Sequence, residues 1–128
     1  MRTYLALTSL ALLVTACAAP QPLNAIQNDA LIAPTCKDKS TCDLYWQRAQ
    51  IWVSQHSSWR IQTANETIIQ TFGPGNKEIT LAYTITKIPD GKGGASITYQ
   101  ASCDNIFGCE MRPVDAFVSL KRFITTGQ

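Results

Sequence analysis

Two segments in the second half of the sequence alternate between apolar and polar residues, and this alternation constrains the fold more than any other feature. Within residues 78–88 and 95–103, the apolar positions are Ile79, Leu81, Tyr83, Ile85, Ala95, Ile97, Tyr99 and Ala101. Because side chains two residues apart lie on the same face of a strand, each segment predicts a strand with one buried and one open face. The glycine-rich residues 90–94 predict a turn between them. We therefore expect an antiparallel pair that covers a core on one side.

Two further β-rich segments precede this pair. Residues 59–63 and 67–72 are separated by Ala64-Asn65-Glu66, and Gly73-Pro74-Gly75-Asn76 follows the second segment. Short turns between consecutive strands favour an antiparallel meander. The sequence therefore predicts a sheet of four strands, whose apolar face needs a cover.

Two helices are expected to provide that cover. Residues 41–55 carry apolar side chains at helical spacing, and Ser40 followed by Asp43 resembles a capping box. A closing helix is expected to begin at Pro113, which suits the first helical turn, and to end near Gly127. The predicted fold class is α+β: helix, four-stranded antiparallel β-meander, helix, with both helices on one face of the sheet.

The N-terminus carries a short apolar segment that ends close to a cysteine. Residues 4–14 are mostly apolar and follow Arg2, but this run is shorter than the about 20 residues that a helix needs to cross a bilayer. A charged start, an apolar run and small residues before a cleavage point are typical of a signal peptide. The sequence Leu13-Val14-Thr15-Ala16-Cys17 also resembles the lipobox of bacterial lipoproteins, in which an aliphatic residue and two small residues precede a cysteine.

In that family the cysteine thiol receives a diacylglycerol, and the leader is cut immediately before the cysteine. The resemblance implies a lipoprotein signal peptide in residues 1–16 and a lipid anchor on Cys17 that holds the mature protein on a membrane. Ala18 stands where an aspartate would favour the inner membrane, so the resemblance implies the inner leaflet of the bacterial outer membrane, facing the periplasm. The alternative is an ordinary secreted protein, cut after Ala16 or Ala19, in which Cys17 is a free thiol or a disulfide partner.

The rest of the chain is expected to divide into a tether and one small domain. Residues 17–35 contain three prolines and no strong amphipathic pattern, which predicts a flexible tether with a root-mean-square reach of about 23 Å. Docking of residues 30–33 on the domain as an edge strand is the alternative. Residues 36–128 are expected to form the domain.

Four cysteines lie in this domain as two pairs with the same spacing, Cys36 with Cys42 and Cys103 with Cys109. Export favours disulfides, whereas structural zinc ligands stand two to four residues apart and redox catalysis uses C-x-x-C. Loop entropy alone prefers bridges between the distant pairs, at roughly 4 kcal/mol against roughly 2.4 kcal/mol for each local loop. We nevertheless expect local pairing, because the repeated spacing indicates two separate clamps.

The sequence offers little support for catalysis or for binding of nucleic acid. Loss of Arg2 with the leader leaves ten of the eleven Lys and Arg residues against nine Asp and Glu, without a cluster of bases. His56 is the single histidine and has no nucleophile motif beside it, and no pair of carboxylates stands out. We expect neither an enzyme nor a bound metal or cofactor.

The surface offers the best candidates for function. Thr84, Thr98 and Gln100 are expected on the open face of the sheet, and Ile106 and Phe107 lie between two bridged cysteines, either exposed or folded back on the core. These residues predict a non-catalytic interaction module of the cell envelope, with a protein partner.

The alternative function is binding of a small molecule or an envelope polymer. Its expected site is a crevice between helices and sheet, lined by Tyr45, Trp52 and Tyr99.

Overall fold

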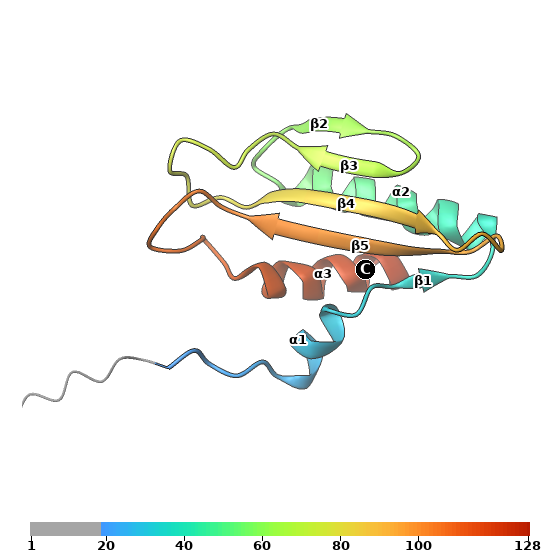
Figure 1. Cartoon of the computed structure of the whole chain (residues 1–128), viewed down its shortest axis with the longest axis horizontal. Helices are drawn as coiled ribbons and strands as arrows, with labels where there is room; N and C mark the ends of the chain where they lie inside the picture. Colours follow the sequence, from blue (N-terminus) through green and yellow to red (C-terminus); the bar gives the residue numbers. More distant parts are fainter. Residues whose placement is uncertain (1–18) are drawn as a thin grey trace, which may run out of the picture.

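The computed structural model describes residues 19–128, and the signal peptide and lipid site predicted at residues 1–17 lie outside these described residues. The helices and strands are α1 (Ala25–Ala30), β1 (Thr35–Cys36), α2 (Lys39–His56), β2 (Ile61–Ala64), β3 (Ile68–Thr71), β4 (Ala82–Pro89), β5 (Ala95–Ser102) and α3 (Pro113–Thr126). The five strands form one sheet in the order β1-β5-β4-β3-β2, and all neighbours are antiparallel (Figure 1). The predicted α+β class is confirmed. The predicted meander corresponds to β2–β5, and β1 adds a short fifth strand.

Both long helices pack on one face of the sheet. The core consists of alternate residues of the strands, which share one face, together with residues of α2 and α3. Its members are Trp46, Ala49, Trp52, Val53, Ile69, Leu81, Tyr83, Ile85, Ile97, Ala116, Leu120 and Ile124. The predicted arrangement of the two helices is therefore confirmed.

The start of β4 differs from the prediction. Residues 78–81 were expected to belong to this strand, but β4 begins at Ala82, and Ile79 is exposed. The backbone of this segment pairs instead with the loop after β5: the Glu110 amide donates to the Ile79 carbonyl at 2.8 Å. These residues therefore hold a loop and do not extend the sheet.

The tether predicted for residues 17–35 is much shorter in the structure. Asn24 and Gln27 form a capping box that starts α1, with side chain to backbone distances of 2.9 and 3.1 Å. The helix docks on α3 through Gln27, whose amide donates to the Asp115 carboxylate at 2.7 Å. The ordered domain therefore begins at Asn24, not at Cys36.

Candidate functional site

The two disulfides have the predicted local connectivity. Cys36 bonds to Cys42 and Cys103 bonds to Cys109, with Cα–Cα distances of 5.2 and 5.6 Å. The second disulfide begins directly after β5 and closes a loop of residues 104–108. The two predicted clamps therefore exist, one before α2 and one after the last strand.

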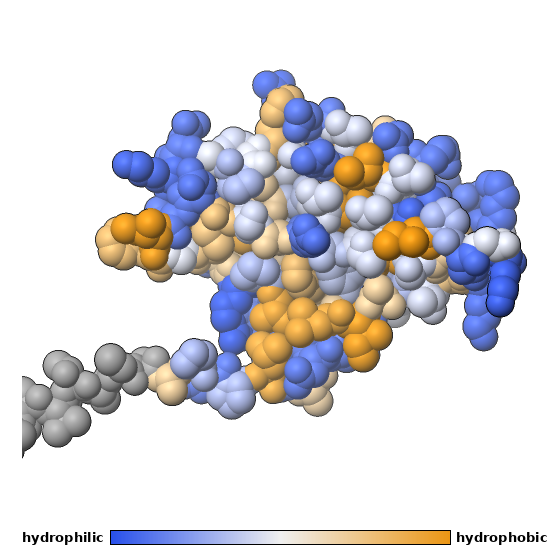
Figure 2. Space-filling view, in the orientation of Figure 1, coloured by the Kyte–Doolittle hydropathy of each residue, from blue (hydrophilic) through white to orange (hydrophobic). Residues whose placement is uncertain are grey.

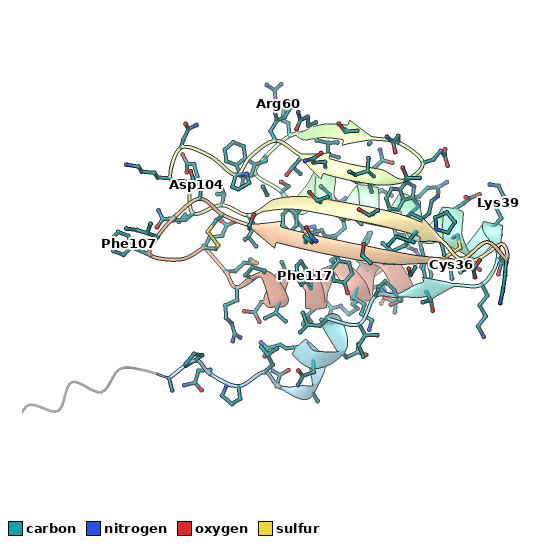
Figure 3. The ribbon with its side chains drawn as sticks, viewed as in Figure 1. Cys36, Lys39, Arg60, Asp104, Phe107 and Phe117 are labelled. Carbon is teal, nitrogen blue, oxygen red and sulfur yellow. A yellow bond between two sulfur atoms is a disulfide. The ribbon has the colours of Figure 1, made fainter. Side chains whose placement is uncertain are left out.

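The loop closed by Cys103 and Cys109 presents two large apolar side chains to solvent. Ile106 is 94% exposed and Phe107 is 93% exposed, so neither folds back on the core. Figure 3 shows Phe107 at the far end of the loop, and Figure 2 shows hydrophobic atoms protruding at the same place. This pair stands out even among the exposed large apolar side chains of residues 19–128, since the next most exposed is Ile26 at 65%.

Hydrogen bonds inside and beneath this loop fix its shape. Asn105 accepts from the Phe107 amide at 2.9 Å, and its own amide group donates to the Lys77 carbonyl at 2.7 Å. The Asp104 carboxylate accepts from the Lys77 amide at 3.1 Å. The Glu110 carboxylate accepts from a backbone amide of residue 81 at 3.2 Å. Both carboxylates therefore tie the loop to residues 77–81.

The polar residues predicted on the open sheet face share that face. Thr84 pairs with Gln100 across β4 and β5, and Thr86 pairs with Thr98. Thr84, Gln100 and Ser102, with Gly73 and Pro74 and their neighbours, line a shallow hollow of about 190 Å³. Since β5 leads directly into the clamped loop, this end of the open face is continuous with the Ile106–Phe107 tip, while Thr98 lies further back along the strand.

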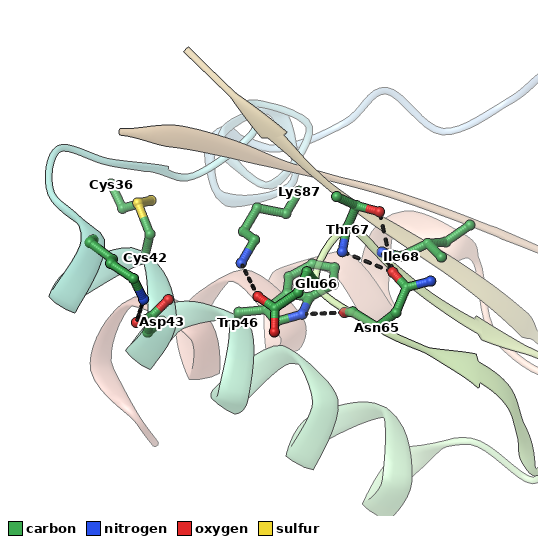
Figure 4. A network of polar contacts seen from close by, with 10 residues as sticks. Cys36, Cys42, Asp43, Trp46, Asn65, Glu66, Thr67, Ile68 and Lys87 are labelled. Atoms are coloured by element: carbon green, nitrogen blue, oxygen red, sulfur yellow. Dashed lines mark hydrogen bonds and ion pairs between the residues drawn. A yellow bond between two sulfur atoms is a disulfide. The ribbon is translucent and has the colours of Figure 1, made fainter. Parts of the chain in front are cut away.

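The surroundings of the first disulfide are very different (Figure 4). Cys36 and Cys42 are both buried and pack against Ala95. Near them, the Trp46 indole donates to the Asn65 carbonyl at 2.8 Å and so joins α2 to the turn between β2 and β3. The Lys87 ammonium lies 5.2 Å from the centre of the Trp46 ring. This disulfide therefore belongs to the packed interior.

The crevice predicted between Tyr45, Trp52 and Tyr99 is filled by the core. The Trp52 indole donates to the Ser119 hydroxyl at 3.0 Å, and its ring stacks on His56 at 4.4 Å. Tyr99 packs against Phe117, and burial raises the pKa of its hydroxyl to about 12, with a smaller contribution from the Asp29 carboxylate. Trp52 therefore belongs to the core, and Tyr45 and Tyr99 pack against it.

His56 ends α2 in a structural position. Its Nδ1 lies 2.9 Å from the Trp52 carbonyl, one turn back along the helix, and its ring is stacked as described above. Within residues 19–128, no group of three or more His, Cys, Asp or Glu side chains is arranged to hold a metal ion.

Comparisons with protein-family models, with curated protein sequences and with solved structures return no match to this chain. Among the helices of the described residues, none is both long enough and apolar enough to cross a membrane.

Proposed function

We propose that this chain is a lipid-anchored, periplasm-facing lipoprotein of the bacterial outer membrane, and that its domain is a non-catalytic module that binds another envelope protein. The anchor is supported by the lipobox resemblance that ends at Cys17, and the two disulfides suit an oxidising compartment. The exposed Ile106–Phe107 tip on its clamped loop is the observation that carries the binding proposal.

The physics of association favours such a tip. A loop already fixed by a disulfide and by the Asn105 hydrogen bonds loses little conformational entropy when it binds. A few aromatic and apolar anchors that enter a pocket supply most of the binding energy in many interfaces. Thr84 and Gln100 lie on the open face of the strands that lead to this loop and offer hydrogen-bonding groups for a partner that covers both regions. The partner is therefore expected to offer an apolar pocket with polar edges.

Binding of a small molecule has weaker support. The hollow beside Thr84 and Gln100 measures about 190 Å³. Sites for drug-sized ligands usually enclose about 300 Å³ or more. The protein-binding proposal is therefore the one that we carry forward.

The test is crosslinking in living cells with the tagged full-length protein, followed by isolation of membranes and mass spectrometry. Four forms are compared: the wild type, Cys17→Ala, the tip variant Ile106→Ser/Phe107→Ser and the control Leu44→Ser/Ile51→Ser. The control removes two apolar side chains of α2 that are 44% and 46% exposed.

We expect one partner that is captured by the wild type and the control, and lost with the tip variant. Cys17→Ala should leave the membrane and lose the partner as well. Capture that is equal for the tip variant and the wild type would refute the role of the tip, and a wild type without acyl groups on Cys17 would refute the anchor.

A further inference from the structure

The large apolar side chains of the short helix α1 and of the two residues that follow it are exposed to solvent. Ile26, Leu31 and Ile32 are 65%, 54% and 64% exposed, while Gln27 and Ala30 face the domain and are buried. Figure 2 shows the resulting hydrophobic patch over α1, below the body of the domain. A helix that docks on a soluble domain normally buries its apolar side and exposes its polar side. In this segment the large apolar side chains are exposed and the polar Gln27 is buried, which is the reverse of the usual arrangement.

Polar contacts hold this helix in place, together with the packing of the buried Ala30. Besides the Gln27 bond to Asp115, the Lys121 ammonium lies 2.9 Å from the Asp29 carboxylate and donates to the Asp29 carbonyl at 2.7 Å. Arg112 also donates to Asp115 at 3.0 and 3.2 Å, and these hydrogen bonds lower the pKa of the Asp115 carboxyl. These contacts therefore hold α1 on the domain while the Ile26 side chain remains exposed.

The short stretch of sequence between Cys17 and α1 limits how far this patch can lie from the surface that holds Cys17. Seven residue steps separate Cys17 from Asn24, the N-cap of α1. They span at most about 25 Å when fully extended, and about 15 Å as a flexible coil. A domain of this length has a radius of gyration of about 13 Å. The side of the domain that carries α1 therefore lies typically about one radius of gyration, and at most about two, from whatever surface holds Cys17.

We infer that the apolar patch formed by Ile26 of α1 and by Leu31 and Ile32, which directly follow this helix, rests in the interfacial region of the lipid bilayer. This inference rests on the proposed lipid anchor at Cys17. Apolar side chains on a helix lying in the membrane plane enter the boundary between headgroups and acyl chains. The short tether keeps the local concentration of lipid high, so that even a weak contact is populated.

The groove beside this patch suits a phospholipid surface. It measures about 400 Å³, lies between α1 and α3 and includes Ile26, Val118 and Arg122. Arg122 is exposed and forms no salt bridge within residues 19–128, so its guanidinium is available to lipid phosphate oxygens. Figure 1 places β2 and β3 on the side of the domain away from α1. The bound domain would therefore present that side to the periplasm.

The test is photocrosslinking of the full-length lipidated protein in vesicles of phosphatidylethanolamine and phosphatidylglycerol. An aliphatic amino acid that carries a diazirine replaces Ile32 in one protein and Ile51 in the other. Ile51 is the matched control because it is 46% exposed and lies on α2 beside Ile61 of β2, remote from α1. After irradiation, mass spectrometry measures lipid adducts at the labelled residue and acyl groups on Cys17 in the same sample.

We expect acylated Cys17 and at least about fivefold more lipid adduct at position 32 than at position 51. Acylated Cys17 with equal adducts at both positions, or with adducts to water or to protein alone, would overturn the membrane contact and leave the anchor intact. Absence of acyl groups on Cys17 would overturn the anchor and this inference together. A melting curve of each labelled protein confirms that the domain remains folded.

Discussion

The two disulfides close loops of the same length and yet do different work. Cys36 and Cys42 are buried, 4% and 6% exposed, and join β1 to α2 inside the packed domain. Cys103 and Cys109 are only partly buried and hold a loop that projects into solvent. Because the spacing is equal, the two disulfides have the same loop-entropy term, but their packing differs. The second disulfide makes its loop rigid, and this rigid loop holds Ile106 and Phe107 in solvent.

Each loop also contains a side chain that shapes it from within. Asp38 caps α2 by accepting from the Thr41 amide at 2.8 Å. In the second loop, the Asn105 side-chain oxygen accepts a similar hydrogen bond from the Phe107 amide at 2.9 Å. The first stabilises a helix that belongs to the core, whereas the second shapes a turn that carries the exposed Ile106 and Phe107. The comparison therefore predicts that changes in the first loop lower stability most, whereas changes in the second lower it less and act mainly on binding.

The largest effect is expected from Cys36→Ala/Cys42→Ala. Loss of the closed loop costs about 2.4 kcal/mol in the chain-entropy model, and the two buried sulfur atoms add lost packing, for a total of about 3 kcal/mol or more. For a domain of this size the melting temperature should fall by more than about 10 °C. Thermal and urea unfolding of the oxidised proteins measure the change. A loss no greater than that of the second disulfide would contradict the comparison.

A smaller loss is expected from Cys103→Ala/Cys109→Ala. The loop entropy is the same, but less packing is lost and the Asp104 and Asn105 hydrogen bonds remain, so we expect little more than the loop term of about 2.4 kcal/mol. The distinctive result is mobility: hydrogen exchange at the Phe107 amide should accelerate far more than in the core strands. Unchanged exchange at that amide would show that the disulfide does not fix the tip.

The pair Asp38→Ala and Asn105→Ala sharpens the comparison through pH. Hydrogen bonds from Thr41 hold the pKa of the Asp38 carboxyl below its ordinary value of 3.8. Its contribution to stability is therefore present above that value and is lost as the pH falls through the lower pKa of the folded state. The stability difference between Asp38→Ala and the wild type should vanish in strong acid, as measured by urea unfolding at several pH values.

The difference caused by Asn105→Ala should persist at low pH, because an amide does not titrate. We expect it to be about 1 kcal/mol, since the carbonyl of Lys77 and the amide of Phe107 lose their partner. If the difference in unfolding free energy from the wild type disappeared in acid for both variants, protonation of the Asp38 cap could not be its cause. A transition of the whole domain in acid would then explain it.

The sequence predicted the parts of the fold that have a periodic pattern. The alternation of β4 and β5 was visible because these strands have eight residues each and one buried face. The closing helix was visible because Pro113 begins it and Gly127 ends it with a φ of 83°, which glycine adopts without strain. The class and the local disulfides followed from these patterns and from the repeated cysteine spacing.

The elements before α2 could not be predicted in this way. β1 has two residues and α1 has six, and Ile26, the one large apolar residue of α1, is exposed, so neither produces a normal periodic signal. The available signal was Asn24 followed by Gln27, which forms the capping box. The candidate site was found only in part, since the sequence identified the tip but not its support by Lys77, Asp104 and Glu110.

The smallest effect on stability is expected at the tip. Ile106→Ser and Phe107→Ser remove side chains that touch almost nothing, so each should change the free energy of unfolding by less than about 0.5 kcal/mol. Tyr45→Ser is the matched change beside the first disulfide, where the ring packs against both Cys36–Cys42 and the main core. It should cost about 2–4 kcal/mol, because it leaves a cavity.

Urea unfolding of the three single variants therefore separates presentation from packing. A stability loss at Phe107 comparable to that at Tyr45 would mean that the ring is packed in solution, and an exposed anchor for a partner would then be excluded. Equal stability of the wild type and both tip variants, together with loss of partner capture, would assign the exposure of these two side chains to binding. The packing of the domain offers no other reason for the free-energy cost of exposing the Ile106 and Phe107 side chains to water.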